Sequence, residues 1–425
     1  MSPSNSSNKK INYIILVLIF VVSGILGVVS ESTYDIAFGN TALGISDKVF
    51  WVGVVYFVGY ITEAFAAATM GVHIDRWGAL RSVFVFSVIA CLVLILSGSL
   101  NVYAGINSII FVVLVAGIMD FLNQLVNIAQ TAAIPQAFGD DKNRLLTFSG
   151  LDSSVRAITG LAAPVIAGFI VSGFAELSSL FIVGLFYGTS AILLIVFLKS
   201  VRSSNSSSSS ADSDEDDSND FYQGMSSGRI IKITFLEIWQ SMSWRKFLIV
   251  DILATAGLST VLLLLFSLLK MEYRWEPEQI GFALAFMALG SLTASILIAR
   301  NNIDNLKYLF GFGALTTGVG SLLLSISGGY FLIVYSGALI IGFGSVLQMK
   351  AMTLIVQVHA PQARIGAWFS VIDGIERVVN ALAIIGSAIL MDLVGGFVVF
   401  SVLSFLLIGC GLWWSFYSSN IILKK

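Results

Sequence analysis

Apolar residues gather along the chain in long runs, and short polar segments separate these runs. A helix needs about 20 apolar residues to cross the hydrocarbon layer of a membrane. Twelve segments meet this requirement, and each is a predicted transmembrane helix: residues 11–30, 49–70, 82–99, 105–131, 146–172, 177–198, 245–269, 278–299, 306–326, 330–356, 365–391 and 395–418. The wide gap between the sixth and seventh runs divides them into two sets of six.

The composition agrees with a protein that crosses the membrane many times. Of the 425 residues, 57% are hydrophobic and only 11% are charged, whereas a soluble protein carries roughly 25% charged residues. The net charge of −2 argues against a nucleic-acid partner. Cys91 and Cys410 lie in apolar runs and are expected to pack as small core residues. Because the chain has only two histidines, we expect no histidine-based metal site, and we expect no cofactor.

The segment between the two sets of six has a different composition. Residues 203–210 are almost all serine and residues 212–220 are strongly acidic, which favours disorder. Apolar residues then recur at helical spacing over residues 229–243, which predicts a helix lying in the membrane interface. We therefore expect three parts: an N-terminal six-helix half, a cytoplasmic linker and a C-terminal six-helix half, over residues 1–199, 200–243 and 244–425.

The distribution of Lys and Arg predicts the orientation of the chain. Cytoplasmic loops of membrane proteins are enriched in these two residues. With the N-terminus in the cytoplasm, the outer side carries only Lys48, Lys270 and Arg274 of the 23 Lys and Arg residues, and most of the others fall on the cytoplasmic side. This bias predicts that both termini are cytoplasmic.

One short phrase occurs twice, once in each half. Residues 148–156 read Phe-Ser-x-Leu-Asp-x-x-x-Arg, and residues 369–377 read Phe-Ser-x-Ile-Asp-x-x-x-Arg. The tripeptide Pro-Gln-Ala precedes each copy, at residues 135–137 and 361–363. The repeat indicates two related halves, which is the usual construction of a secondary transporter.

Each copy of the phrase places an acid and a base one helical turn apart within apolar sequence. Asp152 with Arg156, and Asp373 with Arg377, can each pair on one helix face. Such a pair is either a structural tie near the inner gate or a pair that breaks and re-forms with protonation or cargo. Glu376 adds an acid at the second copy and is a candidate for a bridge to the other half.

Residues 71–81, between the second and third spans, read Gly-Val-His-Ile-Asp-Arg-Trp-Gly-Ala-Leu-Arg. This segment resembles the loop signature of the major facilitator superfamily, Gly-x-Leu-Ala-Asp-Arg-x-Gly-Arg-Lys, at its Gly, Asp, Arg and Gly positions. The resemblance implies an all-α integral membrane fold with twelve transmembrane helices in two pseudo-symmetric six-helix halves. It also implies that Asp75 faces the N-terminus of the eleventh span when the cytoplasmic side is closed, with Arg76 and Arg81 as charge partners. The alternative is a solvated cytoplasmic turn.

The fifth span resembles the antiporter signature of the same superfamily, although small residues replace three of its glycines. The resemblance implies a hinge that is typical of exporters, formed by Gly150, Pro164 and Gly168. The alternative is ordinary close packing of small residues in a membrane helix. The stretch Asn-x-x-Gln-x-x-x-Ile-Pro over residues 127–135, followed by the repeated phrase, also resembles the macrolide-efflux and enterobactin-exporter branch of drug:proton antiporters.

Two further acids, Glu63 and Asp120, lie well inside apolar sequence and have no base one turn away along the chain. Charge is costly in lipid, and a carboxyl in apolar surroundings is suited to binding and releasing a proton near neutral pH. They are the candidates for proton coupling. The alternatives are a hydrogen-bonded helix contact for Glu63 and pairing with Lys350 for Asp120, since the fourth and tenth spans face each other in the family.

Polar residues recur at intervals of three and four in the fourth span, so they share one helix face. The tenth span and the end of the first span add further polar residues. The candidates for lining a substrate cavity are Glu31, Asn123, Gln124, Asn127, Gln348 and Lys350. The alternatives are hydrogen bonds between helices and, for Glu31, exposure to water at the outer end of its span.

These features favour a secondary active transporter and not an enzyme. We expect a proton-coupled exporter (antiporter) of small amphiphilic molecules, such as drugs, macrolides or siderophores, that works by alternating access. It would be a monomer in the bacterial inner membrane, with substrate, protons and the bilayer as partners and with no metal. The alternatives are a proton-coupled importer of a small polar nutrient and a non-transporting receptor or scaffold that signals through the linker.

Overall fold

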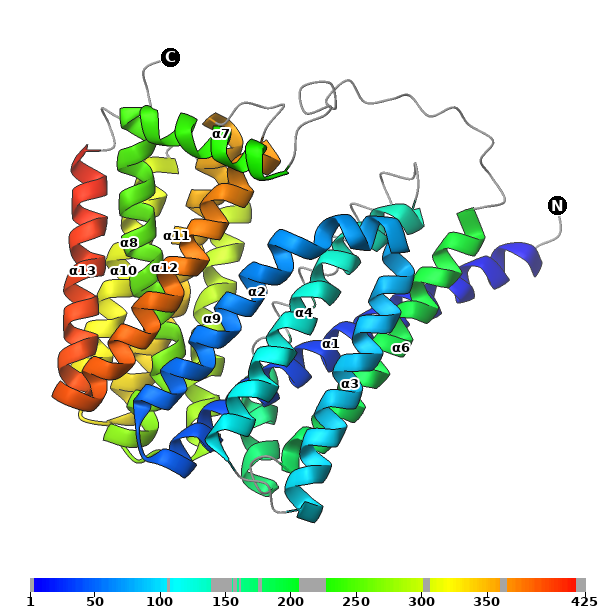
Figure 1. The fold of residues 1–425 in the computed structure, drawn as a ribbon, viewed down its shortest axis with the longest axis horizontal. Coiled ribbons are helices and arrows are strands. Elements are labelled where there is room, and N and C mark those ends of the chain that lie inside the picture. The colour runs from blue at the N-terminus through cyan, green and yellow to red at the C-terminus, as the bar shows by residue number, and fades with distance from the viewer. Residues whose placement is uncertain are drawn as a thin grey trace. The chain divides into compact units, whose positions relative to one another are not determined.

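The computed structural model is built from helices (Figure 1). It describes residues 4–104, 108–138, 155, 159, 162–174, 178–205, 227–300, 306–359 and 365–417, and no strand occurs among them. The chain forms two compact units. The first unit comprises Met1–Asp47, Ile61–Ala211 and Glu276–Gly281, and the second comprises Lys48–Tyr60, Asp212–Trp275 and Phe282–Lys425. The predicted division at residues 199 and 244 stays a prediction.

The long helices of the N-terminal part are α1 (Ser4–Ser46), α2 (Val49–Trp77), α3 (Ala79–Ala104), α4 (Ile109–Phe138) and α6 (Ser179–Asn205). A shorter apolar helix, Ala162–Gly173, precedes α6. The C-terminal part contains α7 (Ser227–Gln240), α8 (Met242–Ser267), the π-helical turn η3 (Leu268–Glu272), α9 (Pro277–Arg300), α10 (Leu306–Ile326), α11 (Phe331–His359), α12 (Ile365–Val394) and α13 (Gly396–Tyr417).

Eleven of the described helices are long and apolar enough to cross a membrane. The helix Ala162–Gly173 falls in the fifth predicted span, and the rest of that span lies largely outside the described residues. The predicted all-α integral membrane fold is therefore confirmed.

The helix α1 extends well beyond the predicted first span, residues 11–30. Polar residues follow residue 30, but α1 continues to Ser46. A helix accommodates hydroxyl groups in apolar surroundings when each donates to a carbonyl one turn earlier, as Thr33 Oγ1 does to Val29 O at 2.6 Å. Glu31 therefore lies in the body of α1 and not at its outer end, which corrects the predicted end of the first span, while its side chain is exposed.

In the first unit, α6 packs against α1 and α3 through small and polar side chains. Ser23 and Ser190 join α1 to α6, because each Oγ donates to the other residue's backbone carbonyl at 2.8 Å. Gly98 of α3 lies so close to α6 that a Cβ atom there would be 2.6 Å from Phe181 N. Such contacts let helices approach closely in lipid, where the hydrophobic effect does not drive their association.

In the second unit, α10 packs between α11 and α13 through pairs of facing glycines. A Cβ atom on Gly320 would lie 2.8 Å from Gly337 O of α11, and one on Gly411 of α13 would lie 2.7 Å from Gly311 O. The backbones of these helices therefore touch, and any side chain at these positions would force them apart.

The helix α7 lies across one end of the second unit's helices and contacts α8 and α12 (Figure 1). Thr234 and Ile238 are buried, whereas Phe235 and Trp239 are exposed and stack on each other with their centroids 5.9 Å apart. The predicted helix over residues 229–243 thus exists as Ser227–Gln240, and its place in the membrane interface stays a prediction.

Candidate functional site

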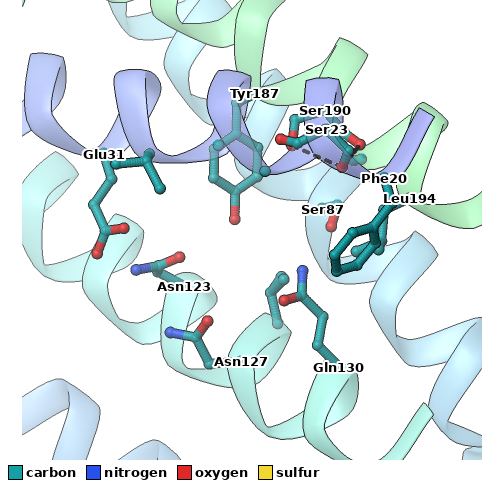
Figure 2. Close-up of a pocket in the computed structure, with 15 residues that line it drawn as sticks. Phe20, Ser23, Glu31, Ser87, Asn123, Asn127, Gln130, Tyr187, Ser190 and Leu194 are labelled. Carbon is teal, nitrogen blue, oxygen red and sulfur yellow. Dashed lines mark hydrogen bonds between the residues drawn. The ribbon is translucent and has the colours of Figure 1, made fainter. Parts of the chain in front are cut away.

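The first unit encloses a polar cavity of about 450 Å³ between α1, α3, α4 and α6 (Figure 2). Figure 2 shows Glu31 at one end of the cavity and the apolar side chains of Phe20 and Leu194 at the other. The polar side chains that line it are Ser23, Glu31, Ser87, Asn123, Asn127, Gln130, Tyr187 and Ser190. A cavity of this size suits a drug-sized ligand.

The helix α4 supplies the side-chain amide groups that line this cavity. Asn123, Asn127 and Gln130 follow one another at intervals of four and three, so they share one face of α4, and Figure 2 shows them around the same space. Of the predicted cavity residues, Glu31, Asn123 and Asn127 line it, whereas Gln124 is half-buried on α4 and does not.

The sequence alone did not identify the contributions of α3 and α6 to this cavity. Ser87 comes from α3, while Tyr187 and Ser190 come from α6. In the sequence these residues look like ordinary members of apolar spans. Only the packing of α6 against α1 and α3 brings them to the cavity.

Four carboxyl groups of the first unit lie close enough to repel one another electrostatically. They belong to Glu31 and Asp35 on α1, Glu63 on α2 and Asp120 on α4. Glu63 and Asp120, the predicted proton-coupling residues, are both half-buried, and Asp120 lies within electrostatic range of Glu63 and of Glu31 at the cavity. A proton or a cation that entered this group would relieve the repulsion.

The second unit holds another cavity of about 560 Å³ between α8, α11 and α12, with Tyr60 of α2 at its wall. The helix α8 contributes Asp251, Thr255 and Ser259 at intervals of four, α11 contributes Gln348, and α12 contributes Glu376 with Asp373. Much of the remaining wall is apolar, from Leu258, Leu262, Leu263, Met349 and Met352.

Asp251 and Glu376 bring two carboxyl groups within hydrogen-bonding reach of each other. Asp251 is fully buried, and no described residue donates a hydrogen bond to either of its carboxylate oxygens or to Glu376 Oε1. Gln348 is 1% exposed, and its amide nitrogen and oxygen also have no hydrogen-bond partner in the described part of the chain. Buried polar groups are normally satisfied, so this arrangement points to a ligand or a proton.

Sequence reasoning gave Asp251 no role and placed Glu376 among the gate residues. The missed signal was local: Asp251, Thr255 and Ser259 form a polar stripe on one face of an otherwise apolar span. The proximity of Asp251 to Glu376 depends on the packing of α8 against α12, which no local pattern reveals.

Comparisons with known proteins identify the family. The family model described as Major Facilitator Superfamily matches residues 13–384. The chain belongs to the major facilitator superfamily. No curated protein sequence matches it.

Solved structures of other transporters share the fold. A bacterial homologue of the iron transporter ferroportin, solved in an inward-facing state, aligns with a TM-score of 0.67 at 16% identity, over 97% of this chain and 99% of that one. The nucleoside transporter NupG aligns with a TM-score of 0.67 at 15% identity, over 96% and 100%. A POT family transporter in complex with a thioalcohol-conjugated peptide aligns with a TM-score of 0.70 at 12% identity, over 96% of each chain. At these identities the likeness establishes the predicted major facilitator fold alone.

The loop signature of this superfamily contains a turn that favours glycine. Gly78 joins α2 to α3 with a φ of 87°, a conformation that glycine adopts without steric cost. Arg81 is exposed near the start of α3. Asp75 and Arg76 belong to the last turns of α2, and their side chains lie outside the described part of the structure. The gate role of these three residues stays a prediction.

The second copy of the repeated phrase forms an ion pair on α12. Arg377 Nε donates to Asp373 Oδ2 at 2.9 Å, and the Asp373 side chain is 54% exposed. Asp152, Arg156 and Gly150 lie outside the described residues. Lys350 is exposed on α11 and lines neither of the two cavities described above.

The remaining predicted hinge residues, Pro164 and Gly168, lie in the helix Ala162–Gly173 against the first turn of α9. A Cβ atom on Gly168 would lie 2.7 Å from Pro277 O, and one on Gly281 would lie 2.6 Å from Pro164 O. Close backbone contact therefore accounts for the glycine at 168, and the hinge role stays a prediction.

Two carboxylates of the second unit, which sequence reasoning missed, bind the first backbone N–H groups of helices. Asp392 accepts from Val49 N and Phe50 N, both at 2.8 Å. Glu272 accepts from Gly396 N at 2.6 Å. The N-terminal N–H groups of a helix have no partner within it, and the helix dipole favours an anion there.

Proposed function

We propose that the protein is a proton-coupled exporter (antiporter) of small amphiphilic molecules such as drugs, macrolides or siderophores. It belongs to the branch of macrolide-efflux and enterobactin exporters and acts as a monomer in the bacterial inner membrane. The observation that carries the proposal is the cavity of the first unit, which is polar around Glu31 and apolar around Phe20 and Leu194 (Figure 2). This lining suits a molecule with a polar head and an apolar body.

The cluster of four carboxyl groups in the first unit supports coupling to protons. Asp120 lies within electrostatic range of Glu63 and of Glu31, so the protonation of one carboxyl changes the field that a cargo meets in the cavity. Ionisable residues inside membrane helices are costly, and they commonly mark a proton or substrate pathway.

The direction of transport is proposed from the fifth span. Its small residues resemble the antiporter signature of exporters, and Gly168 lies in close backbone contact with α9. In the proposed mechanism, the two related halves move about the cargo and expose it to one side of the membrane at a time.

Reconstitution into proteoliposomes tests the proposal. The measurement is the flux of erythromycin, chloramphenicol or a catecholate siderophore, driven by an imposed pH gradient, with the wild type, Glu63→Gln and Asp120→Asn. We expect each substitution to lower gradient-driven flux by roughly tenfold or more, which corresponds to about 1.4 kcal/mol, and to leave cargo exchange without a gradient largely intact. The matched control is Glu276→Gln, which neutralises an exposed acid outside the apolar spans.

Two outcomes would count against the exporter. No gradient-dependent flux of any of these cargoes, together with unchanged behaviour of both variants, would remove the proton coupling. Expression that raises the cellular content of labelled cargo would favour the importer. Deletion of residues 203–224 distinguishes the transporter from the receptor alternative. A transporter should keep its flux without this segment, whereas a receptor that signals through the linker should lose its signal.

A further inference from the structure

The cavity of the second unit contains two acids that lie close together. Asp251 and Glu376 approach each other within hydrogen-bonding reach. The base that interacts with Glu376 is Arg377, and its guanidinium is engaged by Asp373 at 2.9 Å. Two carboxyls that share a site repel each other when both are ionised, and Arg377 is shared with Asp373, so a further cation or a proton at the pair is favoured.

A buried amide gives independent evidence for a ligand at this place. Gln348 lines the same cavity and is 1% exposed, and neither its Nε2 nor its Oε1 has a hydrogen-bond partner among the described residues. An amide left unsatisfied in an apolar interior costs free energy. Gln348 is therefore placed to bind something that enters the cavity next to the carboxyl pair.

The rest of the wall indicates the size and character of that ligand. The cavity measures about 560 Å³, which is within the range of drug-sized sites. Leu258, Leu262, Met349 and Met352 line it, and methionine adapts its shape to different apolar partners. The lining thus combines a negative polar end with an apolar, adaptable wall.

We propose that Asp251, Glu376 and Gln348 form a binding site for an amphiphilic organic cation. The carboxyl pair faces the positive charge of the ligand, and the leucine and methionine side chains pack on its apolar body. This inference rests on the proposed transport function and deepens it, because it assigns a charge to the cargo and a site in the second unit.

In the proposed site the cation and a proton compete for the same two carboxyls. Among the described residues, the other titratable groups near the pair are Asp373 and Arg377 on α12 and Tyr60 on α2. The helix α11 presents Gln348, Met349, Met352 and Thr353 to the cavity, and no described residue of α7, α10 or α13 lines it. Binding of the cation therefore weakens as the pH falls, because protons and cation compete for the same carboxyls.

Equilibrium binding to the purified protein in detergent tests the site without a gradient or transport. The probe is tetraphenylphosphonium, and its control is tetraphenylborate, an anion of nearly the same size and shape. We expect the cation to bind and the anion not to bind. Asp251→Asn and Glu376→Gln should each weaken cation binding by roughly tenfold or more, and Glu276→Gln should leave it unchanged.

A second measurement on the wild type keeps the test decisive if a variant fails to fold. In weakly buffered solution, addition of tetraphenylphosphonium should release protons, as followed with a pH indicator, and lowering the pH should weaken its binding. Absence of cation binding, equal binding of the anion, or binding that is unchanged in both carboxyl variants would overturn the site. Cation binding that depends on the pair, without gradient-driven flux of any cargo, would support the site and remove the proposed function. Gradient-driven flux of a cargo without cation binding would support the proposed function and overturn the cation site.

Discussion

The cavities of the two units offer a ligand different kinds of contact. The first is lined by serine hydroxyls, asparagine and glutamine amides and a tyrosine, with Glu31 at one end. The second is mostly apolar, and its polarity is concentrated in Asp251, Glu376 and Gln348. The repeated phrase relates the fifth span to the eleventh, so α1 and α4 correspond to α8 and α11, and both cavities use these equivalent helices. Equivalent helices therefore carry many hydrogen-bonding groups with a single acid in the first cavity, and few polar groups with a close pair of acids in the second.

The difference predicts which cavity controls which property of the cargo. A neutral hydrogen bond contributes about 0.5–1.5 kcal/mol net, and one to a charged group contributes about 1.5–3 kcal/mol. The first cavity can distribute modest hydrogen bonds over many polar groups. The second concentrates a larger electrostatic contribution in one carboxyl pair. The preference for a positively charged cargo should thus depend mainly on the second cavity. The preference for a particular arrangement of polar groups on the cargo should depend mainly on the first.

The largest expected effect follows from neutralising one acid in each cavity. Glu376→Gln should lower the flux of tetraphenylphosphonium by roughly tenfold or more and change the flux of neutral chloramphenicol by less than about twofold. Glu31→Gln should have the smaller effect on the cation, because the first cavity spreads its polar contacts over many groups. The measurement is initial flux in proteoliposomes for both cargoes. Equal losses of both cargoes in the two variants would break the division between the cavities.

A smaller effect is expected from removing one uncharged polar group in each cavity. Asn127→Leu removes an amide from the first cavity and should weaken the binding of a neutral polar cargo by about fivefold, equivalent to one hydrogen bond. Thr255→Val, which keeps the shape of the side chain in the second cavity, should leave that binding unchanged. Titration of chloramphenicol against tryptophan fluorescence gives both affinities. A stronger effect of Thr255→Val than of Asn127→Leu would reverse the assignment.

The sequence was sufficient for the features that depend on neighbouring residues along the chain. The length of the apolar runs predicted the membrane spans, and the spacing of Asn123 and Asn127 predicted that they share one face of α4. The predicted end of the first span was wrong because the prediction used the apolar run alone. That run stops after residue 30, but hydroxyl groups such as that of Thr33 donate hydrogen bonds within the helix and let α1 continue.

Features that depend on packing between distant helices could not be predicted. Asp251 and Glu376 lie in different spans, and only the contact of α8 with α12 brings them together. Tyr187 reaches the first cavity because α6 packs against α1. The bonds of Asp392 to the start of α2 join residues that are more than three hundred positions apart. A single sequence contains no signal that pairs such positions.

The smallest expected effect separates polar groups that hold the helices from those that face a cargo. Ser23 and Ser190 both line the first cavity, but each Oγ donates to the other's carbonyl at 2.8 Å, so their hydrogen bonds are already used between α1 and α6. Ser23→Ala should therefore lower the free energy of unfolding by about 1 kcal/mol and leave chloramphenicol affinity unchanged, whereas Asn127→Leu should lower that affinity. Thermal unfolding in detergent and ligand titration measure the two quantities on the same samples. Lower affinity with unchanged stability in Ser23→Ala would show that this serine binds cargo, and the polar wall of the first cavity would then include the α1–α6 contact.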